Sequence, residues 1–358
     1  MILVSQMGRE LNACGIIATM QTPTCIFDRF RAIGFRLLFG AILMTSLAPG
    51  AARAEWMTRN EAIMGTRCAV ELWSDDKAAG EAAITSVFDD MKRIDRLMST
   101  WKEDTEISRV NREASKHPVK ISQELFRLLQ VSVEYSELTH GAFDITYASV
   151  GYLYDFKKGV HPDQKAIDQA LPGINWRHMK LDARKTTVFF TRPGMRIDLG
   201  GIAKGYSVDR GIEILQKQGV TRAMVNAGGD TRIIGDRFGK PWVVGIRDPD
   251  HEGKTFLRMP LKDTAFSTSG DYERYFDEDG KRFHHIIDPK TGDSARKCRS
   301  VTIISGNATR TDALTKSVFI MGPEEGIAFI NTLPDVDAVA VSPEGKVFYS
   351  KGLAAPAQ

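Results

Sequence analysis

The chain has 358 residues, 42% of them hydrophobic and 26% charged, with 31 glycines and 14 prolines. This composition is typical of a folded globular protein and excludes a disordered or collagen-like chain. Five of the 48 basic and two of the 45 acidic residues lie in the first 54 positions, which leaves 43 of each in the rest. Because that remainder is formally neutral, we exclude nucleic-acid binding.

The first 54 residues have the order of a secretory signal peptide. Three arginines at positions 29–36 precede an apolar run over 37–47, and the small-residue sequence ARA ends at Ala54. The run is shorter than the roughly 20 residues that cross a bilayer as a helix. We therefore predict cleavage near Ala54 and a periplasmic or exported domain over 55–358, with an uncleaved N-terminal membrane anchor as the alternative.

Two of the four cysteines, Cys68 and Cys298, lie outside this leader. In an oxidising compartment they can pair in one disulfide or remain two separate buried thiols, and the sequence does not decide between these. The sequence has no CxxC motif or Cys/His cluster, so a zinc site is not expected.

Hydrophobic periodicity predicts three helices before position 220. Apolar residues at three- and four-residue steps predict a helix over 81–98. A second helix is predicted from Ser122 as N-cap to near Gly141. A third is predicted over 203–218, closed by Gly219.

Short β-rich runs bounded by Gly, Pro or Asp predict strands. They cover 188–191, 222–226, 242–246 and 301–305, with a hairpin over 338–350. Helices and strands alternate irregularly, which favours an α+β or mixed α/β sandwich over a doubly wound sheet. We expect a single large domain with two intimate lobes.

The first motif, IDLGGIAKG over 197–205, reads as a strand end and a glycine pair that lead into the third helix. The N–H groups at a helix start and the positive charge of Lys204 suit an anion such as phosphate. The motif matches neither GxxxxGK[ST] nor GxGxxG. A phosphate site and a tight structural turn both remain open.

The second motif is VNAGGD over 225–230, at the end of a predicted strand. Gly228 and Gly229 permit close backbone approach, and Asp230 offers acceptors for a ribose hydroxyl or an adenine amine. The alternative is a glycine β-turn capped by the aspartate.

The third motif joins STSGDY over 267–272 to HHIIDPKTG over 284–292. His285 can accept a proton near neutral pH, and a nearby aspartate can orient its ring. A buried, hydrogen-bonded histidine is the alternative, and Asp288 also suits an ordinary turn.

The fourth motif, ATRTDALTK over 308–316, opens a helix whose apolar face includes Leu314, Val318 and Phe319. Asp312 and the hydroxyls around it are hard oxygen ligands, which suit Mg²⁺ or Ca²⁺. The alternative is a carboxylate in the first turn that interacts with the helix dipole.

Four shorter motifs accompany these: MGT over 64–66, MSTW over 98–101, EISR over 106–109 and GAFD over 141–144. In their order along the chain, all of these motifs together resemble the ApbE family of FAD:protein FMN transferases over about 60–350. The resemblance implies an ApbE-like fold and a magnesium-dependent periplasmic or cell-surface enzyme, with Ca²⁺ as a possible substitute. Such an enzyme splits FAD and attaches FMN through a phosphoester to a Thr or Ser of an acceptor protein, releasing AMP. The implied acceptors are subunits of membrane electron-transfer complexes.

The resemblance also implies roles for individual residues. Trp101 matches an aromatic that stacks on the cofactor and is often Tyr in the family. His285 is the implied base, with Asp288 beside it. The implied metal ligands are Gly201, through its carbonyl, Asp312 and Thr315. The other implied FAD contacts are Met64, Ala142, Phe143, Asp144, Asp198, Lys204, Asn226, Gly228, Gly229, Asp230 and Ile286.

One position departs from the family pattern. The family commonly has Thr four residues after the metal-binding Asp, and this chain has Lys316 there. A protonated ammonium cannot ligate a metal, so either Thr315 or water completes the metal sphere, or Lys316 meets the pyrophosphate directly. Two alternatives to the transferase are an FAD pyrophosphatase, which forms FMN and AMP, and a non-catalytic flavin-binding protein.

Overall fold

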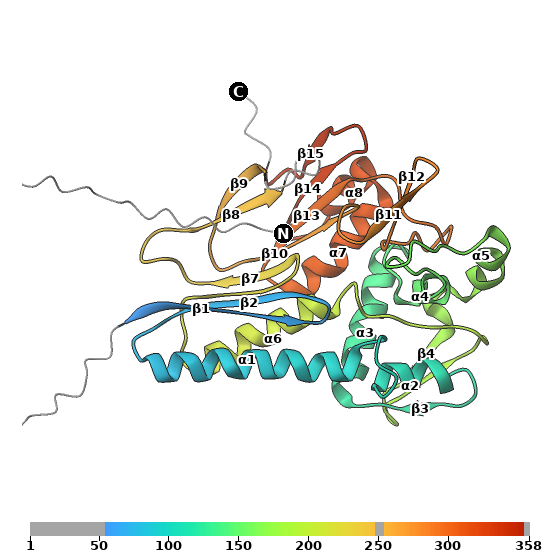
Figure 1. Ribbon diagram of the computed structural model, residues 1–358, viewed down its shortest axis with the longest axis horizontal. Helices are drawn as coiled ribbons and strands as arrows, with labels where there is room; N and C mark the ends of the chain where they lie inside the picture. The colour runs from blue at the N-terminus through green and yellow to red at the C-terminus, as the bar shows by residue number, and fades with distance from the viewer. Residues whose placement is uncertain (1–53, 248–253, 354–358) are drawn as a thin grey trace, which may run out of the picture. The chain divides into compact units, whose positions relative to one another are not determined.

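The computed structural model describes residues 54–247 and 254–353 (Figure 1). The leader lies outside the described residues, so export and cleavage near Ala54 remain predictions. Within the described ranges, helices long and apolar enough to span a bilayer are absent.

The described chain alternates helices and strands irregularly. The α-helices are α1 (Lys77–Met98), α2 (Glu106–Glu113), α3 (Gln123–Leu138), α4 (Ala148–Gly151), α5 (Gln164–Ala170), α6 (Ala203–Lys217), α7 (Ala308–Met321) and α8 (Pro323–Ile330). Single 3-10 turns are η1 (Ile145–Tyr147), η2 (Leu171–Gly173) and η3 (Trp176–His178). The strands are β1 (Glu55–Ile63), β2 (Thr66–Ser74), β3 (Val119–Lys120), β4 (Met179–Asp182), β5 (Thr187–Phe190), β6 (Ala223–Ala227), β7 (Asp230–Ile234), β8 (Trp242–Arg247), β9 (Thr255–Leu261), β10 (Ala265–Gly270), β11 (Tyr275–Glu278), β12 (Lys281–His284), β13 (Ser300–Ser305), β14 (Val336–Val341) and β15 (Val347–Tyr349).

The centre of the fold is an eight-stranded sheet in the order β1-β2-β6-β7-β10-β13-β14-β15, in which neighbouring strands are antiparallel. Helices α1, α6, α7 and α8 pack against it (Figure 1). Side chains alternate along β6, so Val225 packs in the core cluster with α1 and α6, while Met224 packs with Trp242 of β8. The sheet is therefore covered on both faces.

A second core joins α2, α3 and the small sheet β3-β5-β4 to the ends of the long helices. It contains Ile94 and Met98 from the last turns of α1, and Ile202 and Ala203 at the start of α6. Because α1 and α6 contribute to both cores, the two lobes form one compact unit. The predicted α+β class and single domain with two lobes are confirmed.

The predicted helices are confirmed with small shifts at their ends. α1 begins four residues before position 81 because the Asp76 side chain caps the N–H groups of Ala78 and Ala79. Ser122 caps α3 as predicted, through its bond from the N–H of Leu125. α6 ends at Lys217, two residues before the left-handed Gly219.

The predicted strands over 188–191, 222–226, 242–246 and 301–305 correspond to β5, β6, β8 and β13, and the final hairpin corresponds to β14 and β15. The strand end predicted at Ile197 is wrong, because residues 192–202 have no strand structure. The Asn111 side chain instead bonds both the N–H and the C=O of Ile197, and so takes the place of a neighbouring strand.

Cys68 and Cys298 are separate buried thiols, so the disulfide alternative is not realised. Cys68 Sγ donates to the carbonyl of Ile63, and Cys298 Sγ donates to that of Val318. The two residues belong to different core clusters. Burial raises the pKa of Cys68 to about 11 and that of Cys298 to about 12, so both remain unreactive thiols at neutral pH.

Asp209 on α6 caps the N-terminus of α7, a role that sequence patterns did not indicate. Its carboxylate accepts from the N–H groups of Ala308 and Thr309 at 2.9 and 2.8 Å and from the Thr309 hydroxyl at 2.7 Å. Arg232 Nη1 lies 2.8 Å from the same carboxylate. This buried cap fixes α7 relative to α6.

We expect Asp209→Ala to lower the free energy of unfolding by roughly 3 kcal/mol, because it leaves buried donors and a guanidinium without their partner. Urea unfolding followed by circular dichroism measures the change. Glu213→Ala is the control, since Glu213 pairs with Arg210 at the exposed face of the same helix and should cost under about 1 kcal/mol. Equal losses in the two variants would contradict the capping role.

Candidate active site

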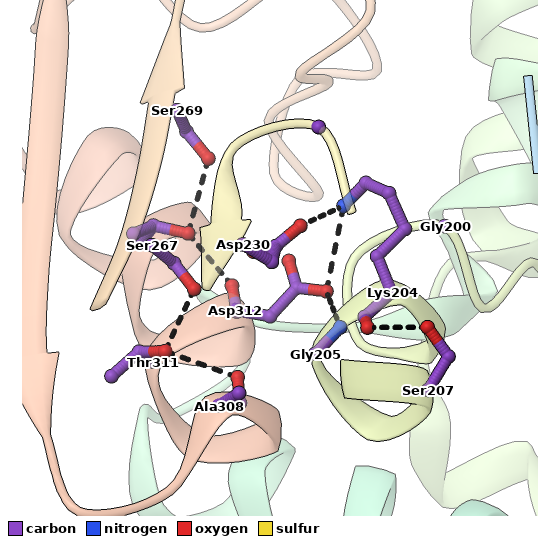
Figure 2. A network of polar contacts seen from close by, with 12 residues as sticks. Gly200, Lys204, Gly205, Ser207, Asp230, Ser267, Ser269, Ala308, Thr311 and Asp312 are labelled. Carbon is purple, nitrogen blue, oxygen red and sulfur yellow. Dashed lines mark hydrogen bonds and ion pairs between the residues drawn. The ribbon is translucent and has the colours of Figure 1, made fainter. Parts of the chain in front are cut away.

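The start of α6 touches α7 at the centre of the site (Figure 2). A Cβ atom at Gly205 would lie 2.2 Å from the carbonyl oxygen of Ala308, so only glycine permits this contact. The Gly205 N–H donates to Asp312 Oδ2 at 3.0 Å. The glycine therefore places a carboxylate of α7 at the N-terminus of α6, where unpaired N–H groups favour negative charge.

Lys204 reaches from α6 to two buried carboxylates (Figure 2). Its Nζ lies 2.6 Å from Asp230 Oδ2 and 3.5 Å from Asp312 Oδ2. Burial opposes the charge of Lys204, but the two carboxylates outweigh it and raise the lysine pKa above its usual range. Lys204 therefore carries its charge at any working pH.

The two carboxylates differ in how their charge is balanced. Burial raises the pKa of Asp230, and the negative charge of Asp312 adds to this effect. Burial also disfavours charge on Asp312, but the ammonium groups of Lys204 and Lys316 hold its pKa below the usual value. Asp312 is thus the carboxylate on which both lysines converge.

Lys316 bonds the second oxygen of Asp312. Its Nζ contacts Asp312 Oδ1 from one turn further along α7 and lies 3.2 Å from Thr315 Oγ1. The Thr315 hydroxyl also donates to the Asp312 carbonyl at 2.7 Å and accepts from Ser269 Oγ at 3.0 Å. The alternative, a first-turn carboxylate that interacts with the helix dipole, is not realised, because Asn307 is the N-cap and Asp312 lies in the second turn.

Gly201 lies beside the side chain of Lys316. A Cβ at Gly201 would meet the Phe143 ring at 3.4 Å and the Cγ of Lys316 at 3.7 Å. The structure therefore brings together Gly201, Asp312 and Thr315, the residues expected to ligate a metal, but it places the stem and ammonium of Lys316 among them.

Asp198 joins the loop before α2 to the glycine turn before α6. One carboxylate oxygen accepts from the Thr100 hydroxyl, and the other accepts from Tyr147 OH at 3.1 Å and from the Gly200 N–H at 2.6 Å. Trp101 follows Thr100 and is 79% exposed. Asp198 thus positions this exposed indole relative to the glycine turn rather than offering free oxygens to a ligand.

The NAGGD segment is the turn between β6 and β7, as the β-turn alternative predicted. Asn226 Nδ2 bonds the carbonyls of Gly228 and Asp230 and so holds the turn closed. A Cβ at Gly228 would lie 2.7 Å from Thr66 Oγ1, and one at Gly229 would lie 2.4 Å from a backbone oxygen of β10. The glycines serve close packing, and Asp230 is the counterion of Lys204.

The MGT segment forms the tight turn between β1 and β2. Met64 and Gly65 both have positive φ, of 54° and 69°, as a type I′ hairpin turn requires. Arg274 Nη2 donates to the carbonyl of Gly65 at 3.2 Å. A hollow of about 390 Å³ lies beside this turn and is lined by residues 62–66 with Lys92 and Asp95. Met64 lines this hollow and is partly buried against both neighbouring core clusters.

His285 has a buried Nδ1 without a hydrogen-bond partner among the described residues. The backbone N–H of His285 donates to the backbone carbonyl of Arg274 at 3.1 Å. Burial lowers the pKa of His285 to about 3, and the positive charges of Arg274, Lys316 and Lys204 act in the same direction. His285 therefore lies within the field of the lysine pair and is neutral at pH 7.

Asp288 does not orient His285 in the described part of the chain. Its side chain accepts from the Lys290 N–H at 2.9 Å, and its carbonyl accepts from Thr291 and Gly292. The Asp288 carboxylate caps the turn after β12, so it does not have the predicted role of orienting His285. The buried histidine with satisfied bonds is instead the neighbouring His284, whose ring bonds the Ala295 carbonyl and the Ile286 N–H.

The remaining expected contacts are mostly buried. Ala142, Phe143 and Ile286 are core side chains, with Phe143 facing Gly201. Asp144 accepts from the Thr146 N–H and hydroxyl and from the Trp176 N–H. Burial raises the pKa of Asp144 despite these bonds, and its role is to fix the turn that carries Phe143.

We expect the protein to lose stability as pH falls from about 6.5 toward 4. Burial lowers the pKa of His284 to about 4 and that of His285 to about 3 in the folded chain, whereas unfolded histidines titrate near pH 6.5. The unfolded state then binds more protons, so each histidine lowers stability by up to about 1.4 kcal/mol per pH unit in this window. Urea unfolding at several pH values measures the slope. His284→Gln should reduce the slope of unfolding free energy against pH, whereas His117→Gln, at an exposed position, should leave it unchanged. A flat wild-type profile, or the same slope in both variants, would contradict the prediction.

The residues Arg274, Tyr147 and Ser269 contact the site and were not predicted from the sequence. Each makes its contact across a long sequence distance, as in the bond from Arg274 to Gly65. Ser269 lies within the quoted STSGDY motif, so its polar position in a buried strand was the available signal.

The fold is an antiparallel sheet flanked by helices, and a glycine turn and two lysines meet at the contact between α6 and α7. The ApbE family model matches residues 64–340, and the chain belongs to the ApbE family. An FAD:protein FMN transferase of Treponema pallidum is 33% identical over 323 residues, covering 85% of this chain and 89% of the relative. One of Klebsiella pneumoniae is 32% identical over 294 residues, covering 80% and 90%.

Solved structures have the same fold. The crystal structure of the ApbE protein from Thermotoga maritima superposes with a TM-score of 0.77 at 33% identity, covering 83% of this chain and 98% of that one. The flavin transferase ApbE from Vibrio cholerae gives a TM-score of 0.74 at 28% identity, with the same coverage.

Proposed function

We propose that this protein is an FAD:protein FMN transferase. The observation that carries the proposal is the convergence of Lys204 and Lys316 on one buried carboxylate beside the N-terminus of α6. Each ammonium has three N–H donors, and the contacts described leave one on each side chain for a phosphate oxygen. Membership of a family whose relatives bear this name supports the same reading.

In the proposed reaction, the hydroxyl oxygen of an acceptor Thr or Ser attacks the phosphorus on the FMN side of the FAD diphosphate. A new P–O bond forms to the acceptor, the P–O bond to the adenylate breaks, and AMP leaves with the bridging oxygen. The lysine pair neutralises charge that develops on the phosphoryl oxygens. Trp101 is exposed and follows Thr100, which bonds Asp198. Its ring offers a face on which the flavin or adenine stacks, and such stacking contributes roughly 1–3 kcal/mol by analogy with nucleobases.

The acceptor proton passes to His285 in this proposal. The unpartnered Nδ1 is available, and the ring is neutral at pH 7. A pKa of about 3 makes His285 a weak base in the free enzyme. The negative charge of bound FAD favours the protonated ring and so raises this pKa toward the working pH.

Magnesium dependence was expected from the resemblance, and the side chains here do not fit it. Both oxygens of Asp312 and the hydroxyl of Thr315 already bond Lys204, Lys316, the Gly205 N–H or Ser269. Among the described residues, no group of three or more His, Cys, Asp or Glu side chains is arranged to hold a metal ion. In this proposal the two lysines alone neutralise the phosphoryl oxygens.

We further propose a periplasmic location, from the leader sequence, and acceptors among membrane electron-transfer proteins, from the family resemblance. The test is co-expression with a candidate acceptor followed by mass spectrometry of the acceptor. The proposal expects a covalent FMN increment on one Thr or Ser and its absence when that residue is changed to Val. Release of AMP at the same rate without any acceptor would favour the pyrophosphatase, and intact FAD after incubation with an authentic acceptor would favour a binding protein.

A further inference from the structure

Lys316 contacts Asp312 and Thr315, two of the three residues that the family resemblance assigns to a metal. Asp312 is completely buried, and its two oxygens face three donors: Lys316 on Oδ1, and Lys204 with the Gly205 N–H on Oδ2. Thr315 is equally buried, and its oxygen accepts from Ser269 and Lys316 while its proton goes to the Asp312 carbonyl. A hydroxyl oxygen accepts two hydrogen bonds, so Thr315 has no acceptor site left for a metal.

Charge balance leads to the same result. Two carboxylates, Asp230 and Asp312, face two ammonium groups, those of Lys204 and Lys316. A divalent cation at Asp312 would lie near both ammonium groups, and like charges repel strongly in a buried site. It would also have to displace the stem of Lys316, whose Cγ and Cδ lie beside Gly201.

We propose that Lys316 replaces a divalent cation in this chain, so that its ammonium, with that of Lys204, binds the FAD diphosphate without metal. This inference rests on the proposed function, because it concerns the same diphosphate site. The side chain of Lys316 is 16% exposed and that of Lys204 is 22% exposed, whereas the side chains of Asp312 and Asp230 are buried. The lysine pair is held in place before the ligand arrives, which lowers the entropy lost on binding.

The first experiment measures FAD binding to the purified wild-type chain by flavin and tryptophan fluorescence, in EDTA and in MgCl₂. We expect the dissociation constants to agree within about twofold, and MgCl₂ alone to leave the melting temperature unchanged. Wild-type protein that binds FAD only with MgCl₂ would overturn the inference while leaving the proposed function in place. Absence of FAD binding in both buffers would overturn the proposed function and the inference with it.

The second experiment converts the position to the residue that is common in the family. Lys316→Thr should weaken FAD binding in EDTA by roughly 10-fold to 100-fold, the value of one charge-assisted hydrogen bond. MgCl₂ should restore binding to this variant and raise its melting temperature. Lys316→Arg keeps the charge and should bind FAD in EDTA. Lys165→Thr, the same change at an exposed position of α5, is the control for the loss of one lysine and should not change FAD affinity. If Lys316→Thr bound FAD in EDTA with unchanged affinity, the inference would be contradicted.

Discussion

We expect His285→Ala to lower the rate of FMN transfer by roughly 10²-fold to 10⁴-fold, the usual contribution of general-base assistance. The expectation follows from a ring nitrogen that is buried, unpartnered among the described residues and within the field of Lys204 and Lys316. FAD affinity should change little, because the cationic donors for the diphosphate remain. Single-turnover transfer and fluorescence titration with FAD measure the two quantities separately.

The matched control for this change is His284→Gln. His284 is the adjacent histidine, but both of its ring nitrogens are hydrogen-bonded, to the Ala295 carbonyl and the Ile286 N–H, so its loss should reduce stability more than turnover. In the pH profile of the wild-type turnover, the acid limb should depend on His285 and should disappear in its alanine variant. Equal losses of turnover and FAD affinity in His285→Ala would assign the histidine to binding instead.

The sequence predicted elements where local chemistry determines structure. Ser122 and Gly219 were identified because an N-cap and a left-handed φ each favour particular residue types. The Asp76 cap of α1 was not identified. The strand β10 was missed because its pairing with β7 and β13 depends on partners far along the chain. The strand expected at Ile197 failed for a related reason, since a side-chain amide on α2 provides its bonds.

The same distinction holds in the site. Lys204, Asp230 and Asp312 were each identified from their motifs, but their shared ion network depends on the contact at Gly205 between α6 and α7. Gly228 and Gly229 permit the close approach of neighbouring backbone and side-chain atoms of this chain, and their contact with a ligand remains a prediction. A motif identifies which residue types are present, whereas packing decides whether their free atoms face a ligand or one another.

Asp312→Asn should reduce transfer at least 100-fold and lower the free energy of unfolding by roughly 3–5 kcal/mol. An amide cannot accept on both of its atoms, so one donor among Lys204, Lys316 and the Gly205 N–H loses its partner in a buried position. FAD binding should weaken only partly, since both ammonium groups remain to attract the diphosphate. Thermal unfolding, FAD titration and transfer assays on one preparation separate these effects.

A double-mutant cycle tests whether this loss arises from the ion network. Adding Lys316→Gln to Asp312→Asn removes the unpaired ammonium, so the double variant should be more stable than the sum of the two single changes predicts, by about 1–3 kcal/mol. Transfer should remain low in the double variant, because the cation that neutralises the phosphoryl oxygens is missing. Full activity in Asp312→Asn, or strict additivity in the cycle, would show that the two lysines do not depend on Asp312 for their positions.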